Sequence, residues 1–330
     1  MTTLILGTSN VHDRLLGLVA SAAGSDAEVL LQGPSGVGKE LYARRIHELS
    51  SRASATFVPV NCGALPADLF ENELFGHAGG AFTGARARSA GLAAEAHHGT
   101  LFLDEIDSLP LSSQVKLLRF IQQKEYRPLG DSRLRRSDAR IIAATNTDLV
   151  TAVQEGRFRA DLFFRLRVLP LAIPPLRERR EDIPPLLEHF LRRYSAEYGK
   201  PPVSLSREAL RRLCAYDWPG NIRELENCVR YLVCTHGGST VHPEALPLLS
   251  HLGQETVAPS LPAPAAPLHQ ETFQSAKRRV VSAFERQYLQ AMLQAHHGNI
   301  AAAARASGKH RRAFFELMRR HGLTREPCEQ

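Results

Sequence analysis

Three absences limit the class of protein that this sequence encodes. The 330 residues contain no apolar run that approaches the roughly 20 residues of a membrane-spanning helix. The N-terminal segment MTTLILGTSN lacks the basic region and the long apolar stretch of a signal peptide. The five cysteines are odd in number and form no CxxC pair, which argues against a disulfide framework or a zinc site. We therefore expect a cytoplasmic protein with reduced thiols.

The positive charge of the chain is concentrated near its C-terminus. The net charge is +7, and residues 271–330 carry eleven Lys or Arg against five Asp or Glu. A basic segment of this length suggests a polyanionic partner, with nucleic acid as the first candidate. From charge alone, a solvated basic tail is the alternative.

Hydrophobic patterning divides the chain into four parts. Apolar strand-like runs at 28–33, 57–61, 100–105 and 140–146 alternate with helical segments, which predicts a parallel sheet covered by helices on both faces. The next 74 residues have helical periodicity throughout, and the proline-rich stretch after them has none. The predicted architecture is an α/β subdomain at 1–175, a helical subdomain at 176–249, a linker at 250–271 and a helical C-terminal domain at 272–330.

A glycine-rich segment, GPSGVGKE, follows the first predicted strand and precedes a helix. This is the context of a phosphate-binding loop, in which backbone N–H groups and the helix N-terminus face phosphate oxygens. Glu40 stands where the general motif has a Ser or Thr for Mg²⁺, so we expect another carboxylate and water to hold the ion. ATP is the predicted ligand, and its candidate contacts are Gly33, Pro34, Ser35, Gly36, Val37, Gly38, Lys39 and Glu40.

Two carboxylates end a later predicted strand. LFLDE, at 101–105, is an apolar run that finishes in Asp104 and Glu105. At the end of a strand the backbone is able to turn both side chains toward a ligand. Asp104 is then placed to organise Mg²⁺ and Glu105 to polarise the attacking water, as phosphoryl transfer requires. A chance glycine-rich turn and an acidic strand-end cap are the alternatives, and the occurrence of both motifs together argues against them.

The hexapeptide GAFTGA at 80–85 is unsuited to a helix or a core strand, because two of its six residues are glycine. The residues alone predict either an exposed loop that presents Phe82 and Thr83 to another macromolecule or a packed aromatic in an ordinary turn.

This hexapeptide is identical to the signature loop of the sigma-54-dependent activators, a branch of the AAA+ ATPases. Five further blocks resemble family blocks, and the similarity extends over nearly the whole chain: GPSGVGKE, LFLDEI, FRADLFFRL (158–166), PPLRERREDI (174–183) and WPGNIREL (218–225). The resemblance implies an AAA+ core with a helical lid, a ring that is hexameric in the family, and contact with the sigma-54 factor and RNA polymerase. The implied contact residues are Gly80, Ala81, Phe82, Thr83, Gly84 and Ala85.

The resemblance also implies roles for single residues around the nucleotide. Asn61 matches the switch residue that restrains Glu105 until the γ-phosphate is sensed. Thr145 and Asn146 match the sensor I position, and Arg223 matches sensor II in the lid. For Arg223 an ion pair on a helix face is the alternative.

Arg159 and Arg165 match the arginine fingers of the family. Such fingers act on ATP bound to the neighbouring subunit, where a guanidinium neutralises charge on the phosphate oxygens. Surface salt bridges are the alternative for each.

Two places depart from the family pattern. The phosphate loop has Pro34 and Val37 where the family usually has Glu and often has Thr, and neither position is needed to cradle phosphate. The base of the hexapeptide loop, Ala78–Gly79, lacks the acidic and basic residues typical there, so the flexibility of the loop or its coupling to nucleotide is expected to differ.

Residues 296–323 predict two helices with a turn at Ser307–Gly308. Phe314, Leu317 and Met318 form an apolar stripe on the second helix and leave its arginines off that stripe. A helix-turn-helix with a basic second helix fits a DNA major groove, and the segment resembles the Fis-type module that dimerises through a preceding helix, here about 273–295. The candidate DNA contacts are Asn299 (which also caps the first helix), Lys309, His310, Arg311, Arg312, Phe315 and Arg319.

The sequence as a whole predicts a DNA-binding ATPase that remodels the closed promoter complex of sigma-54 polymerase. A chaperone-type AAA+ unfoldase does not explain the helix-turn-helix, and the intact hexapeptide argues against a repressor whose ATPase controls only assembly. About 27 residues precede the first predicted strand, which is too short for the receiver or sensing domain common in the family. We therefore expect control by a separate protein, by expression level or by a domain outside this chain.

The variant Thr83→Ala is expected to spare ATP hydrolysis and to abolish transcription activation, because Thr83 belongs to the output loop and not to the nucleotide site. Parallel measurements of ATP turnover and of open-complex formation check this. If hydrolysis is lost together with activation, the loop has a structural role instead.

Overall fold

The computed structural model describes residues 5–64, 66–81, 87–247, 281–282, 285–286, 288–290, 292–293, 296 and 299–321, the side chains of 67–68 excepted. The chain divides into two compact units, Met1–Ser250 and His251–Gln330. Among the described residues, no helix combines the length and the apolar character needed to cross a membrane.

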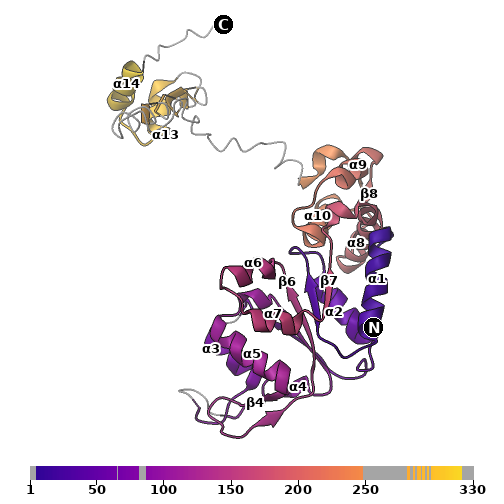
Figure 1. Ribbon diagram of the computed structural model, residues 1–330. Coiled ribbons are helices and arrows are strands. Elements are labelled where there is room, and N and C mark those ends of the chain that lie inside the picture. Colours follow the sequence, from indigo (N-terminus) through magenta and orange to yellow (C-terminus); the bar gives the residue numbers. More distant parts are fainter. Residues whose placement is uncertain are drawn as a thin grey trace. The chain divides into compact units, whose positions relative to one another are not determined.

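A five-stranded parallel sheet forms the centre of the first unit (Figure 1). Its spatial order is β2-β3-β6-β1-β7, so the first strand of the chain lies inside the sheet and not at its edge. Four strands fall within the runs predicted from the sequence, and β7 is an additional strand within the predicted α/β range. The strands are β1 (Val29–Gln32), β2 (Phe57–Asn61), β3 (Thr100–Asp104), β6 (Arg140–Thr145) and β7 (Leu169–Ala172).

Helices cover both faces of this sheet (Figure 1). Successive strand residues point to opposite faces, so Leu101 and Leu103 join one apolar core while Phe102 joins the other. The first core packs against α3 (Ala67–Phe75), α5 (Leu111–Gln123) and α7 (Ala160–Leu166), and the second against α1 (Asn10–Ala23) and α2 (Lys39–Glu48). The predicted α/β class is confirmed. Smaller elements are α4 (Leu92–Glu95), α6 (Leu149–Gln154) and the antiparallel pair β4 (Glu125–Tyr126) and β5 (Arg135–Arg136).

A helical lid with its own core completes the first unit. It contains α8 (Ile183–Glu197), α9 (Arg207–Ala215) and α10 (Asn221–His236), which pack around the buried Trp218. The prediction of helix throughout this region is wrong in one detail, since β8 (Ser204–Leu205) and β9 (Thr240–Val241) form a short parallel pair. This pair has a packing reason: Val203 and Val241 are buried in the lid core, which brings the two chain segments together.

The described part of the second unit contains a helix-turn-helix. It consists of α13 (Ile300–Ala306) and α14 (Arg311–Arg320), joined by a turn in which Gly308 has a φ of +64°. Asn299 caps α13 as predicted, because its Oδ1 accepts hydrogen bonds from the backbone N–H groups of Ala301 (3.1 Å) and Ala302 (3.2 Å). Phe314 and Met318 are buried against the small side chains of α13, which confirms the predicted apolar stripe. The helix predicted at 273–295 lies largely outside the described residues.

Candidate nucleotide-binding site

The carboxyl ends of three neighbouring strands bring the predicted catalytic residues to one edge of the sheet. The glycine-rich loop follows β1, Asp104 ends β3, and Thr145 ends β6, which lies between them. The register aligns Gln32 with Thr145 and Asn61 with Asp104. In parallel sheets this edge is the usual position of a ligand site.

The glycines of the loop are required by its backbone geometry. Gly36 and Gly38 have φ values of +77° and +94°, a region that favours glycine. A Cβ on Gly33 would lie 2.5 Å from the carbonyl oxygen of Ile173, so that position needs glycine for a steric reason. The loop therefore turns tightly into the N-terminus of α2, where backbone N–H groups are available to an anion.

Lys39 is the cation of this loop and is 8% exposed. Its Nζ donates hydrogen bonds to the carbonyl oxygens of Gly33 (2.9 Å) and Pro34 (3.2 Å). Burial lowers the pKa of Lys39, and the nearby carboxylates of Asp104, Glu105 and Asp107 oppose that shift. Lys39 thus lies between the loop and the acidic strand end.

Glu105 adopts a left-handed backbone conformation, with a φ of +55°, directly after β3. Because of this turn, the side chain of Glu105 points in a different direction from that of Asp104. Oδ1 of Asp104 accepts a hydrogen bond from the Glu105 N–H (3.0 Å). The Glu105 carboxylate lies against Gly63, where an added Cβ would collide with its Oε2. Asn61 shapes the same loop, because its Oδ1 accepts hydrogen bonds from the N–H groups of Gly63 (2.8 Å) and Ala64 (3.1 Å). Asn61 therefore contacts the segment that faces Glu105.

The sensor I position involves a residue that sequence reasoning missed. Thr145 is buried and its hydroxyl donates to Oδ1 of Asp107 at 2.6 Å, whereas the side chain of Asn146 is exposed. Asp107 lies two residues beyond the carboxylate pair of LFLDE, and an acid in that short turn was the available signal.

The lid contacts the phosphate loop directly through the start of α10. The N–H groups of Ile222 (3.0 Å) and Arg223 (3.3 Å) donate to the Gly36 carbonyl, and Nη1 of Arg223 donates to Oγ of Ser35 (3.1 Å). Nδ2 of Asn221 donates to the Ser35 carbonyl at 2.8 Å, a contact that sequence reasoning missed although Asn221 lies in the WPGNIREL block. A cavity of about 480 Å³ opens between Ser35 and α10, next to Arg223.

Two other loop residues do not present a polar side chain to this cavity. Val37 is fully buried beneath the loop. Glu40 pairs with Arg44 at 2.8 Å on the half-exposed surface of α2.

Of the two predicted finger arginines, Arg165 lies on α7 and Arg159 is the residue just before its first turn. Oδ2 of Asp161 pairs with Arg159 at 2.7 Å, and Oε1 of Glu28 pairs with Arg165 at 3.2 Å. Glu28 precedes β1, whereas the phosphate loop follows the other end of this four-residue strand. Such a strand spans about 13 Å, so Arg165 is placed away from the phosphate loop of its own chain.

The hexapeptide loop is described only at its base, and Phe82, Thr83, Gly84 and Ala85 lie outside the described residues. His77 exchanges backbone hydrogen bonds with Ser89, and the Ala78 N–H donates to the Leu129 carbonyl at 2.9 Å. Gly80 has a φ of +80° with open space around it, and Ala81 packs close to Gly130. The loop thus begins between the end of α3 and the β4–β5 connection.

The predicted DNA contacts are all exposed residues of the second unit. Lys309 and His310 precede α14, and its arginines are exposed, with Arg312 paired to Glu316 at 3.4 Å. Phe315 is 54% exposed although it is a large apolar side chain. The remaining members are Arg311, Arg319 and, at the start of α13, Asn299.

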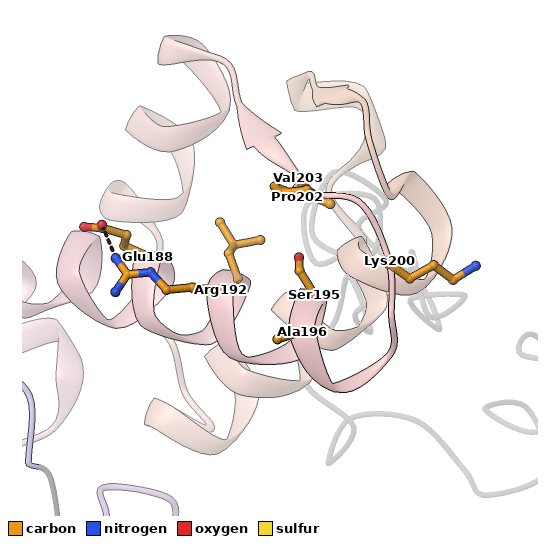
Figure 2. A pocket seen from close by; sticks show the side chains of 8 residues that line it. Glu188, Arg192, Ser195, Ala196, Lys200, Pro202 and Val203 are labelled. Atoms are coloured by element: carbon orange, nitrogen blue, oxygen red, sulfur yellow. Dashed lines mark hydrogen bonds and ion pairs between the residues drawn. The ribbon is translucent and has the colours of Figure 1, made fainter.

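A second pocket, of about 560 Å³, lies on the lid between α8 and residues 200–203 (Figure 2). The cation Arg192 at its rim is paired with Glu188 at 2.6 Å. It is lined by residues of the lid alone, and none of the predicted site residues belongs to it.

The sheet, the phosphate loop and the lid that contacts it define an AAA+ P-loop NTPase. Residues 5–172 match the family model of the sigma-54 interaction domain. Residues 177–260 match the AAA+ ATPase lid domain, and residues 280–320 match the Fis family of bacterial regulatory proteins. The chain belongs to the sigma-54-dependent transcriptional activators.

Named relatives agree with this assignment. The transcriptional regulatory protein GlrR of Escherichia coli (strain K12) is 45% identical over 311 residues, which are 94% of this chain and 66% of GlrR. The sigma54-dependent transcriptional activator SfnR of Pseudomonas putida is 49% identical over 253 residues, 75% of this chain and 69% of SfnR. The crystal structure of NtrX from Brucella abortus in complex with ADP matches 98% of this chain and 70% of that one, with 33% identity and a TM-score of 0.73. This chain spans just under two thirds of GlrR.

The variant Gly36→Ala is expected to destabilise the first unit, because a Cβ there would collide with the Gly220 carbonyl of the lid. Gly156→Ala is the matched control, since Gly156 has a similar φ of +72° but open space around it. The left-handed conformation alone costs about 1–2 kcal/mol for a residue with a side chain. We expect Gly36→Ala to lower the free energy of unfolding by more than Gly156→Ala in urea titrations. Equal losses would show that the close approach of lid and loop carries no stability.

Proposed function

We propose that this chain is an ATP-hydrolysing activator that binds upstream double-stranded DNA and remodels the closed complex of sigma-54 RNA polymerase. The observation that carries the proposal is the convergence of Lys39, Asp104, Glu105 and Thr145 on one sheet edge, with Arg223 of the lid on the same loop. The domains carry over from the sequence: an ATPase at 1–175, a lid at 176–249, a linker at 250–271 and a DNA-binding domain at 272–330.

The groups at this edge of the sheet match the chemistry of ATP and Mg²⁺. The glycine-rich turn offers N–H groups and Lys39 offers a cation, which match phosphate oxygens. Mg²⁺ prefers oxygen ligands and keeps several waters, and Asp104 is the carboxylate placed to hold it directly or through water. When bound, the ion supplies neutralisation of phosphate charge.

Glu105 is the proposed general base for the attacking water. Its carboxylate lies against Gly63, in the loop that Asn61 shapes by two hydrogen bonds. A change at Asn61 therefore alters the support of Glu105, which suits the role of a switch between the γ-phosphate and the base.

Arg165 is proposed to complete the site of a neighbouring copy of this chain. Its pairing with Glu28 places it at the amino end of β1, so it serves phosphates only across a subunit boundary. A ring, a hexamer by analogy with the family, satisfies this requirement. Arg159 is assigned to the same boundary.

The output is assigned to residues 80–85, which follow in the chain the base held by the hydrogen bond between Ala78 and Leu129. Contact with the sigma-54 factor at Phe82 and Thr83 is proposed from the identity of this segment with the family loop. Control of the activator is assigned to a separate protein, to expression level or to a domain outside this chain.

The variant Arg165→Ala is expected to lose ATP turnover while it still binds nucleotide, because the guanidinium acts on the transition state in the next subunit. Mixing it with Lys39→Ala is expected to restore part of the turnover, since each variant supplies what the other lacks. Arg157→Ala is the control, because Arg157 is an exposed arginine that pairs with Glu155. Unchanged turnover in Arg165→Ala would refute the assignment, and a lack of recovery in the mixture would refute action between subunits.

Open-complex formation on a sigma-54 promoter tests the function itself. The full chain is expected to open promoter DNA with ATP and to fail with a non-hydrolysable analogue. ATP hydrolysis without promoter opening would favour the unfoldase alternative. DNA binding without ATP hydrolysis and without promoter opening would favour the alternative function of a DNA-binding repressor.

A further inference from the structure

Arg179 is a buried arginine of the segment that joins the sheet to the lid. It is 2% exposed and lies between the short turns Leu176–Glu178 and Arg180–Asp182. Its Nη2 donates to the Val37 carbonyl (3.2 Å) and its Nη1 to the hydroxyl oxygen of Tyr42 (3.2 Å). One guanidinium therefore joins the phosphate loop to the helix that follows it.

The burial of this cation calls for an explanation. Its Nε has no hydrogen-bond partner, and a buried charge that is incompletely paired is costly. An apolar side chain of similar length would fill the same space without that cost. An arginine at position 179 is thus better explained by its hydrogen bonds to Val37 and Tyr42 than by a gain in stability.

The Val37 carbonyl is a sensitive point of the loop. The peptide group is planar and trans, so the Val37 carbonyl and the Gly38 N–H belong to one plane and point in opposite directions. On one side of this peptide stands Gly38, whose φ of +94° is left-handed and which has no side chain to restrict rotation of the peptide. A donor on the Val37 carbonyl therefore sets the direction of the Gly38 N–H.

The neighbouring peptides of the loop are held in the same way. The Ser35 carbonyl accepts from Asn221, and the Gly36 carbonyl accepts from Ile222 and Arg223. Each of these bonds orients the N–H of the following residue. Arg179 is the donor that extends this pattern to Gly38, the residue that caps α2.

Asp182 ties this support to the N-terminal segment of the chain. Its N–H donates to the Arg179 carbonyl (3.0 Å), and its Oδ1 accepts from the N–H groups of Thr8 (2.7 Å) and Ser9 (2.8 Å). Asp182 is fully buried, and the ring of His12 occupies the space beside Gly7 that a Cβ would need. The segment 7–9 is thus packed tightly onto the same turn that carries Arg179.

We propose that Arg179 is a positioning residue for nucleotide binding, which aims the Gly38 N–H at phosphate, and that Asp182 couples the segment 7–9 to this support. The inference rests on the nucleotide-binding function proposed above and deepens it. It implies that whatever moves residues 7–9 changes the affinity for nucleotide through the back of the phosphate loop.

Arg179→Met in the full chain tests the first part. Removal of a hydrogen bond from a charged donor is expected to weaken binding of ADP, labelled with a fluorescent group on the ribose, by about tenfold. KM for ATP is expected to rise with little change in kcat, because an N–H that serves bound substrate and transition state alike contributes uniform binding. Arg179→Lys, which keeps one donor, is expected to be intermediate.

Arg180→Met is the matched control. Arg180 is the adjacent arginine, but it is exposed and bonds to Ala215 and Asp217 and not to the loop. It is expected to bind ADP like the unaltered chain. Thermal unfolding of each variant shows whether it is folded. If Arg179→Met is not folded, ADP binding by Arg179→Lys tests the positioning role of Arg179.

The outcomes separate this inference from the proposed function. If the unaltered chain fails to bind ADP, the proposed function falls. If it binds ADP and folded Arg179→Met binds equally well, or if Arg180→Met loses as much, the positioning role of Arg179 is overturned.

Asp182→Asn tests the coupling, with Glu181→Gln as the exposed neighbouring control. Loss of the buried charge is expected to weaken ADP binding severalfold, whereas the control is expected to have no effect. The double variant Arg179→Met with Asp182→Asn is expected to bind no more weakly than Arg179→Met alone, because Asp182 acts through Arg179. Full additivity, or unchanged affinity in Asp182→Asn, would overturn the coupling.

Discussion

The support of the phosphate loop by the lid is the constraint on which the remaining site depends. Four donors from beyond residue 175 bond to carbonyl groups of residues 35–37: the side chains of Arg179 and Asn221 and the backbone N–H groups of Ile222 and Arg223. Since each carbonyl shares a rigid plane with the next N–H, these bonds determine which way the loop N–H groups point. Glycine at position 36 is a condition of this support, because a side chain there would meet the Gly220 carbonyl.

The lid and the phosphate loop are in direct contact at the start of α10. Arg223 reaches Ser35 from the same helix end that bonds to the loop backbone. The base of the hexapeptide loop belongs to another part of the unit, where Ala78 and Leu129 hold it. The sheet edge itself is formed by neighbouring strands, since Asp104 ends β3 and Asn61 ends the adjacent β2.

Most of the fold and the candidate site were predictable because the relevant signals are local. Continuous apolar runs identified four of the five strands, and the glycine-rich loop and LFLDE identified the two halves of the site. The short strand pair in the lid was not predictable, because β8 and β9 have two residues each and form only where packing of Val203 and Val241 brings them together. Asp107 and Asn221 were missed for a similar reason, since their roles depend on partners distant in the sequence.

The sequence by itself determined the class of the protein, because a phosphate loop, an acidic strand end and a signature hexapeptide are contiguous motifs whose chemistry is specified by residue type. Only the tertiary structure decided how these motifs are supported. The pairing of Arg165 with Glu28, 137 residues apart, places this proposed finger arginine away from the phosphate loop of its own chain. The contacts of Arg179 with Val37 and of Asp182 with Thr8 likewise join segments more than 140 residues apart, and no local pattern records which buried polar group meets which backbone carbonyl.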